Sequence, residues 1–310
     1  MDHSLYYQIF RYFEATVQNQ SIGQLINDCL NLSNFIITET KNFFNEEGIP
    51  IPVGFTDDDV NINAKKLYLD EQIFHFVAHT CKAGLISQGV ALVESVRKDV
   101  RDFFTETLQK TTSLFNKVIE IGIQEGVYAT APTIEVQQNV EFVESKRYFL
   151  QMKKRPLNTI ELSNLVENIK TNAIGRSILS GFLQTTQNEE VKGYIRQGIK
   201  IADKHIKIFS EELEESNIKP PNIVNSYTTN STEPVFSDKL IVSLITIFSS
   251  IGQSNYATSA ASSMRYDLAL NFQRLLIEVA LYENDGANLL IKNNWLEEPP
   301  QIPDRNKLTK

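Results

Sequence analysis

Ser95-Val96-Arg97-Lys98-Asp99-Val100 and Ser263-Met264-Arg265-Tyr266-Asp267-Leu268 are two versions of one hexapeptide, 168 residues apart. The same spacing joins other identical residues, among them Asp70 with Asp238, Gly84 with Gly252, and Phe104 with Phe272. Earlier in the chain the spacing is 169 and joins Ile9 with Ile178, Phe13 with Phe182, and Ile26 with Ile195. A nearly constant spacing along most of a 310-residue chain indicates an internal duplication.

Each copy has the apolar periodicity of helices. In the second copy, apolar residues recur every three or four positions, which marks one face of a helix: Val191, Ile195, Ile199, Ala202, Ile206, Phe209 and Leu213. Strand-like alternation is nowhere sustained. We therefore expect four helices in each copy, at about 4–18, 21–47, 70–94 and 97–125 in the first and about 158–187, 189–216, 237–260 and 264–284 in the second.

The connection between the second and third helix of each copy is long, with roughly 20 residues. Extended, it reaches on the order of 60 Å, whereas a helix of about 25 residues is ~38 Å long. Two hairpins joined by a crossover that runs along the bundle form the ferritin-like topology. A disordered loop is the alternative, but Ile49, Ile51 and Phe55 favour packing. We predict an all-α protein of two tandem ferritin-like four-helix bundles, 1–135 and 158–310, with a linker at 136–157.

Composition narrows the function classes. The chain has 30 basic and 38 acidic residues and a net charge of −8, which disfavours nucleic acid as a partner. The N-terminus has no basic region before an apolar run, so it does not resemble a secretory signal. The longest apolar stretch, 240–251, contains Ser and Thr and is shorter than the ~20 residues that span a bilayer. We expect a cytoplasmic protein without a membrane partner.

The histidines do not fit a di-metal site. Such a site in a ferritin-like bundle needs two Glu-x-x-His pairs, and none of His3, His75, His79 and His205 has a Glu three residues earlier. His75 and His79 are spaced to share a zinc ion on a helix, but the second copy has Ser243 and Ile247 there. This favours two polar helix residues, although zinc binding by this pair stays open. His205, beside Ile206 and Phe209, is expected to be a packing residue rather than a general base.

Other reactive groups also fit structural roles. Cys29 and Cys81 align with Gly198 and Ser249, so we expect small residues where helices approach closely, rather than nucleophiles. The sequence has no Walker loop, Gly-x-Ser-x-Gly, dinucleotide fingerprint or Cys-x-x-Cys motif. It therefore predicts no catalytic, cofactor-binding or metal residues, and no cofactor; whether the protein is an enzyme is left open, with a non-enzyme favoured.

Two polar features remain. Arg97 with Asp99, and Arg265 with Asp267, stand at the start of the fourth helices, where Ser95 and Ser263 are expected to cap and the Asp to favour the helix dipole. A ligand site shared by both copies is the alternative. Trp295, followed by two Glu and two Pro, is expected to cover the end of the second bundle or to anchor a partner.

Several strings resemble one bacterial family along almost the whole chain: Pro52-Val53-Gly54-Phe55-Thr56-Asp57-Asp58-Asp59-Val60-Asn61, Arg97-Lys98-Asp99-Val100-Arg101-Asp102-Phe103-Phe104, Gly181-Phe182-Leu183-Gln184, Phe236-Ser237-Asp238-Lys239-Leu240 and Trp295-Leu296-Glu297-Glu298-Pro299-Pro300-Gln301. The sequence is similar to the uncharacterised tandem-repeat family of endospore-forming bacteria, related to spore coat protein F. The resemblance implies ferritin-like bundles and a spore-associated structural or interaction protein. The alternative is a bundle that binds a small ligand or a metal.

The first helix of the first copy is expected to be short. Residues 160–170 form the early turns in the second copy, and their counterparts would precede Met1. We expect an apolar groove on the first bundle, which marks an interaction site. The segment 136–153 is one candidate to cover it, and packing between the bundles is another. A partner chain or a second copy in a symmetric dimer is the third.

Overall fold

The computed structural model describes residues 1–128, 132, 134–135, 138–149, 154–221 and 227–305. Within these residues the chain forms eight α-helices and two 3-10 turns, and no strand longer than an isolated bridge. The helices are α1 (Asp2–Thr16), α2 (Gln20–Glu46), α3 (Asp70–Glu94), α4 (Lys98–Gln124), α5 (Thr159–Thr185), α6 (Glu189–Glu215), α7 (Asp238–Ser262) and α8 (Tyr266–Lys292). The predicted all-α fold of two tandem four-helix bundles is confirmed.

The last helix extends further than its predicted end at 284. The string Asn284-Asp285-Gly286 has the composition of a turn, yet α8 continues through it to Lys292. Gly286 has a packing role there, because a Cβ atom at this position would collide with the hydroxyl of Tyr194 on α6. The helix propensity lost at one glycine is about 1 kcal/mol, which close packing of two helices outweighs.

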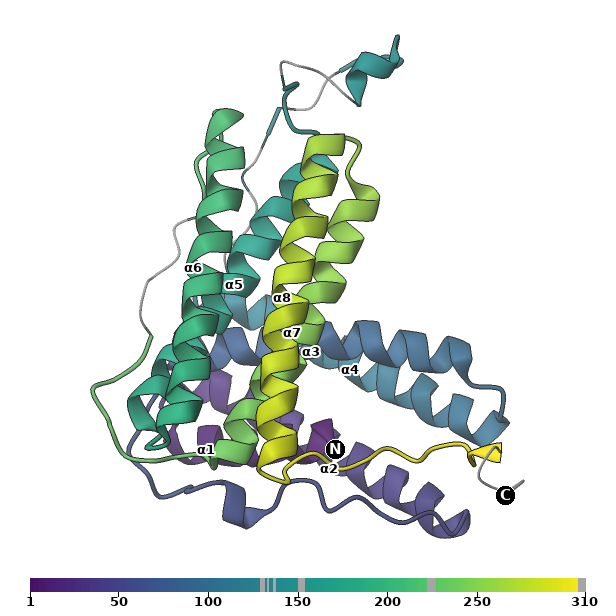
Figure 1. The fold of residues 1–310 in the computed structure, drawn as a ribbon, viewed down its shortest axis with the longest axis vertical. Helices are drawn as coiled ribbons and strands as arrows, with labels where there is room; N and C mark the ends of the chain where they lie inside the picture. Colours follow the sequence, from purple (N-terminus) through teal and green to yellow (C-terminus); the bar gives the residue numbers. More distant parts are fainter. Residues whose placement is uncertain (129–131, 133, 136–137, 150–153, 222–226, 306–310) are drawn as a thin grey trace.

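Both bundles are built from hairpins. In the second bundle α5 packs on α6 and α7 on α8, and contacts of α5 with α7 and of α6 with α8 close the square. In the first, α1 pairs with α2, α3 with α4, and α2 also packs on α4. The second bundle follows the long axis of the molecule and the first lies across its lower end (Figure 1).

The two long links meet at the corner between the bundles. Figure 1 shows the link of the first copy running along its bundle to this corner, where residues 227–237 of the second link also lie. There they pair antiparallel, through the bridges Val60–Phe236 and Tyr68–Thr228. Because positions 60 and 68 correspond to 228 and 236, the two bridges exchange under the duplication. The copies are therefore related by an approximate two-fold axis that passes between the links.

The cores of the two bundles are unequal. One large core is continuous across the corner and draws residues from both copies. A second core fills only the far half of the second bundle, with Tyr256, Leu275 and Val279 among its members. The corresponding residues of the first copy are Gln88, Thr107 and Thr111, which are buried polar side chains. Thr111 donates a hydrogen bond to Gln88 over 2.8 Å. The far half of the first bundle thus has a polar interior.

Helix α1 has 15 residues, against 27 in α5. The segment proposed to fold over the gap does not do so within its described part: Val140 and Phe142 are 86% and 88% exposed. Phe149 instead packs on Tyr266 at the far end of the second bundle; positions 136–137 and 150–153 lie outside the described residues. The two bundles do pack on each other, because α3 contacts α5; whether this packing covers the gap stays a prediction.

Candidate functional site

The duplicated Arg-x-Asp pair lies at the far end of each bundle. In the second copy Arg265 is 2% exposed, and its guanidinium binds Asp267 (2.5 Å) and Glu212 on α6 (3.0 Å). Lys154 approaches Glu212 from the linker side at 2.9 Å. These contacts lower the pKa of the Asp267 carboxyl, with the hydrogen bond from Arg265 as the largest cause. The pair therefore ties α6, α8 and the linker together.

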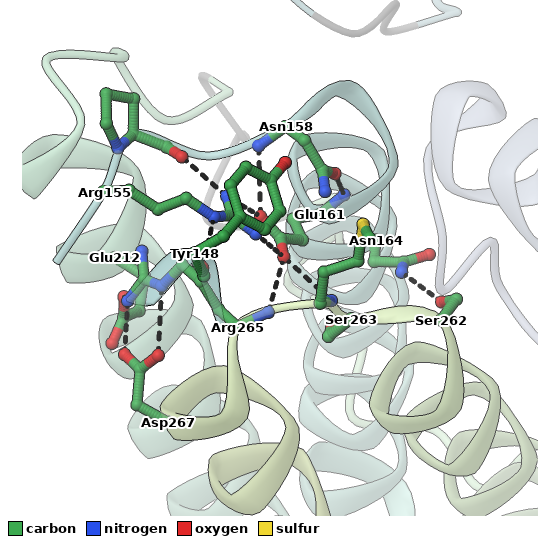
Figure 2. A network of polar contacts seen from close by, with 12 residues as sticks. Tyr148, Arg155, Asn158, Glu161, Asn164, Glu212, Ser262, Ser263, Arg265 and Asp267 are labelled. Atoms are coloured by element: carbon green, nitrogen blue, oxygen red, sulfur yellow. Dashed lines mark hydrogen bonds and ion pairs between the residues drawn. The ribbon is translucent and has the colours of Figure 1, made fainter. Parts of the chain in front are cut away.

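Glu161 is the centre of this network (Figure 2). Its side chain is fully buried and binds the Arg155 guanidinium with both oxygens, at 2.8 and 2.9 Å. The same carboxylate accepts hydrogen bonds from the backbone N–H groups of Asn158, Met264 and Arg265. Burial alone would raise the pKa of Glu161, but Arg155 and the N–H donors outweigh it and lower the pKa. One carboxylate thus joins the start of α5 to the loop between α7 and α8.

The first copy has no such closure. Arg97 binds Asp99 at 2.6 Å and Glu47 at 2.5 Å, but its side chain is 50% exposed. No described residue of the first copy corresponds to Glu161. The arginine and the glutamate are 3% and 12% exposed in the second copy and 50% and 46% exposed in the first. The aspartates are exposed to a similar extent in both copies. The described contacts of both pairs are ion pairs with residues of the same chain. They fit a structural role rather than a shared ligand site.

The predicted serine caps are wrong. Ser95 donates to the carbonyl of Ala91, and Ser263 to that of Ser259, so each hydroxyl bonds the end of the preceding helix. The fourth helices begin three residues later, at Lys98 and Tyr266, beyond the reach of a serine cap. Asp99 and Asp267 do lie in the first turns of these helices, as expected for the helix dipole.

His205 is fully buried in the second bundle and is satisfied by neighbours that the sequence pattern did not indicate. Its Nδ1 lies 2.8 Å from the Tyr256 hydroxyl, and its Nε2 lies 3.3 Å from Glu278. Since a carboxylate only accepts, Nε2–H donates to Glu278 and Nδ1 accepts from Tyr256. Burial is the main cause that lowers the His205 pKa. This neutral, hydrogen-bonded imidazole fits the predicted packing role.

His75 and His79 lie in the junction between the bundles. The His75 ring contacts Tyr227 and the His79 ring contacts Phe248, with centroids 5.7 and 4.9 Å apart. Burial lowers the pKa of each histidine to about 4. No group of three metal-ligating side chains occurs in the part of the chain that the structure describes. Both histidines make ring contacts with the other copy.

Added zinc is not expected to change the thermal stability of the protein. Because His75 and His79 lack a third ligand among the described residues, a zinc ion would be held by two protein ligands, fewer than the three or four of natural sites. We expect the melting temperatures of the wild type and of His75→Ala to show no dependence on added zinc. A zinc-dependent rise that His75→Ala abolishes would contradict this expectation.

The cysteines and the tryptophan also have structural surroundings. Cys29 and Cys81 are buried and unbridged, and their mutual hydrogen bond is the first cause that raises the Cys29 pKa. Their adjacency was not visible in the sequence. Trp295 packs against the large core, and two residues later the Glu297 carboxylate accepts from the N–H groups of Val53 and Gly54. The tail thereby fastens α8 to the link of the first copy.

An apolar stripe on α3 is exposed within the described part of the chain. Ile86, Val90 and Val93 are 47%, 53% and 86% exposed, and their spacing of four and three residues places them on one face of the helix. Their counterparts on α7 are Ser254, Thr258 and Ala261, so this face is not apolar in the second copy. By length and composition, α3 and α7 are also the helices among the described residues that could cross a membrane. The stripe is therefore a candidate interaction site.

Sequence reasoning missed Glu161 and the α3 stripe, although both left a signal. Asn158-Thr159-Ile160-Glu161 has the spacing of a capping box, and the structure forms it. The stripe appears when the two copies are compared position by position, as apolar residues opposite Ser and Thr. The partners of His205, by contrast, come from α7 and α8 and had no local signal.

A family model matches the chain twice, in agreement with the duplication. A family model described as "Protein of unknown function (DUF3231)" matches residues 1–140 and again 148–308. Among solved structures, the crystal structure of a "putative spore coat protein" from Bacillus halodurans C-125 is similar, with 21% identity and a TM-score of 0.46. The match covers 48% of this chain and 98% of that one. No curated protein matches.

Proposed function

The chain belongs to the DUF3231 family, whose model matches it twice, and on this premise we propose that it is a non-enzymatic protein that acts through protein–protein contact, with a second copy of itself as partner. The observation that carries the proposal is the uncovered stripe Ile86, Val90 and Val93 on α3. Exposed apolar side chains at helical spacing mark a surface that packs against another helix.

The stripe is complementary to itself. An antiparallel pair of α3 helices related by a two-fold axis near Gln88 would set Ile86 against Val90 of the second copy. In the same register Lys82, which pairs with Glu167 of its own chain at 2.7 Å, faces Glu94 of the second copy, so opposite charges meet at both ends of the pair. Two helix faces bury less than the roughly 1,600 Å² of a standard interface, so we expect a reversible dimer.

The duplication supplies the variant that tests this. In Ile86→Ser/Val90→Thr/Val93→Ala the stripe receives the residues that α7 carries at the same positions. We expect the wild type to dimerise in a concentration series by analytical ultracentrifugation and this variant to remain monomeric. Folding is preserved, because the changed side chains are exposed.

The matched control places the stripe on the other copy. Ser254→Ile/Thr258→Val/Ala261→Val, combined with the α3 substitutions, is expected to restore association through α7. A wild type that is monomeric throughout the series, or an α3 variant that dimerises as well as the wild type, would refute the proposal. A wild type that instead floats with lipid vesicles would assign the stripe to a membrane.

A role in the endospore is the second part of the proposal, and the sequence resemblance to the family around spore coat protein F supports it. The large buried apolar cores support a soluble protein, and its retention in the spore as a cytoplasmic protein is part of the proposal. Immunoblots through growth and sporulation test this part. We expect the protein to accumulate only after sporulation begins, and constant levels in growing cells would contradict it.

A further inference from the structure

The interior of the second bundle contains a cavity of about 90 Å³ near the corner between the bundles. Gly175 on α5 and Gly252 on α7 line it, and a Cβ atom at either position would meet no other atom within 4 Å. Leu179, Leu244 and Val279 are among the apolar residues of the remaining wall, and His79 on α3 also borders the cavity. The cavity is partly open to the surface, and the two glycines leave space between helices that are otherwise closely packed.

The first copy fills the same space with aromatic rings. Tyr6 and Phe10 on α1 correspond to Gly175 and Leu179, and Phe76 on α3 corresponds to Leu244. The three rings pack against one another with centroids 6.0–6.4 Å apart. The fold therefore does not require a void at this place, and the small residues belong to the second copy alone.

One end of the cavity is polar. Asn172 and Tyr256 line it, and the Tyr256 hydroxyl accepts a hydrogen bond from the Asn172 amide over 2.8 Å. Because the same hydroxyl donates to His205, its oxygen keeps one free acceptor position. A ligand at this end would donate one hydrogen bond to Tyr256, while the rest of its surface meets mostly apolar side chains, both aliphatic and aromatic.

We infer that this cavity is a binding site for a small, uncharged molecule with a short branched hydrocarbon body and one hydroxyl group. The volume accommodates roughly three or four methyl-sized groups, since a water molecule occupies ≈ 30 Å³ of liquid. A charged ligand is excluded, because the wall holds no ion to pair with it and burial of an unpaired charge is costly. Aliphatic cavities of this kind take up apolar guests and noble gases.

The first test uses xenon and an exchange of residues between the copies. Crystals of the wild type under xenon pressure are expected to show one bound xenon atom in the second bundle. Leu244→Phe, which installs the residue of the first copy, is expected to lose it. Phe76→Leu makes the reverse change and is expected to create a xenon site in the first bundle.

The second test measures the ligand class in solution. Isopropanol is the probe, followed by saturation-transfer NMR, and its affinity is expected to fall about tenfold or more in Leu244→Phe because the ring occupies the site. If Leu244→Phe does not fold, Leu179→Phe is used instead, because the first copy has Phe10 at the position of Leu179. Wild-type crystals without xenon in the second bundle, or isopropanol binding that the filled variants retain, would overturn the inference.

The cavity and the α3 stripe can fail separately. The variant Ile86→Ser/Val90→Thr/Val93→Ala alters only exposed side chains of the first bundle. It is expected to bind xenon like the wild type, whatever its state of association.

Discussion

Replacing Glu161 by Gln is expected to lower the free energy of unfolding by about 3–5 kcal/mol. The amide keeps the shape of the carboxylate but not its charge, and one of its two oxygens becomes an NH₂ group. The buried Arg155 guanidinium then loses its counter-charge, and the N–H groups of Met264 and Arg265 face a weakened acceptor. Urea denaturation followed by circular dichroism measures the change.

Glu189→Gln is the matched control. Glu189 also lies in the first turn of a helix and pairs with Lys192 at 2.7 Å, but its side chain is 75% exposed. Ion pairs on the surface contribute little to stability, so this variant is expected to unfold like the wild type. Equal losses of unfolding free energy in the two variants would show that the Glu161 network stabilises the protein no more than an exposed ion pair does.

The pH dependence of the free energy of unfolding tests the same network independently. The pKa of Glu161 lies below its ordinary value of 4.5 in the folded protein. The carboxylate therefore contributes stability at pH values above 4.5, and this contribution is lost as the pH falls through the folded pKa. We expect the wild type to lose stability in that acid range and Glu161→Gln to show a shallower dependence. Parallel curves for both proteins would contradict this assignment.

The second large effect is expected at Gly286. Tyr194 on α6 packs against Gly286, and Tyr282 on α8 packs against Gly198, so two large–small pairs interlock the helices. The tyrosine rings stack with centroids 4.4 Å apart. Gly286→Val would push Tyr194 out of this interlock and is expected to cost about 1–3 kcal/mol. Thermal and urea denaturation measure the loss.

The first copy offers the compensating change. At the positions of Tyr194 and Gly286 it has Leu25 and Val118, a pair of medium-sized residues. Tyr194→Leu alone leaves a cavity and is expected to destabilise, whereas Tyr194→Leu/Gly286→Val recreates the packing of the first copy. We expect the double variant to be more stable than either single one, with a coupling energy of about 1–3 kcal/mol. Additive losses would show that the two positions do not pack as a unit.

Much of the architecture could be predicted from the sequence, because the apolar periodicity of a helix depends on residues that are only three or four positions apart. The residue spacings of 168 and 169 located both copies, and apolar periodicity located eight helices with ends mostly within a few residues of the structure. The error at α8 arose where a glycine that serves packing resembles a turn. Glu161 could have been found from its capping box, since its partner in that motif, Asn158, is only three residues away.

The rest depended on which helices meet. The sequence by itself determined the duplication, the all-α class and the roles of residues whose partners are near in the chain. The tertiary structure decided the two-fold pairing of the links, the unequal cores, the cavity opposite the rings of Tyr6 and Phe10, and the exposure of the α3 stripe. Periodicity tells which face of a helix is apolar, but whether that face is covered depends on residues more than a hundred positions away, whose distance in space no local pattern encodes.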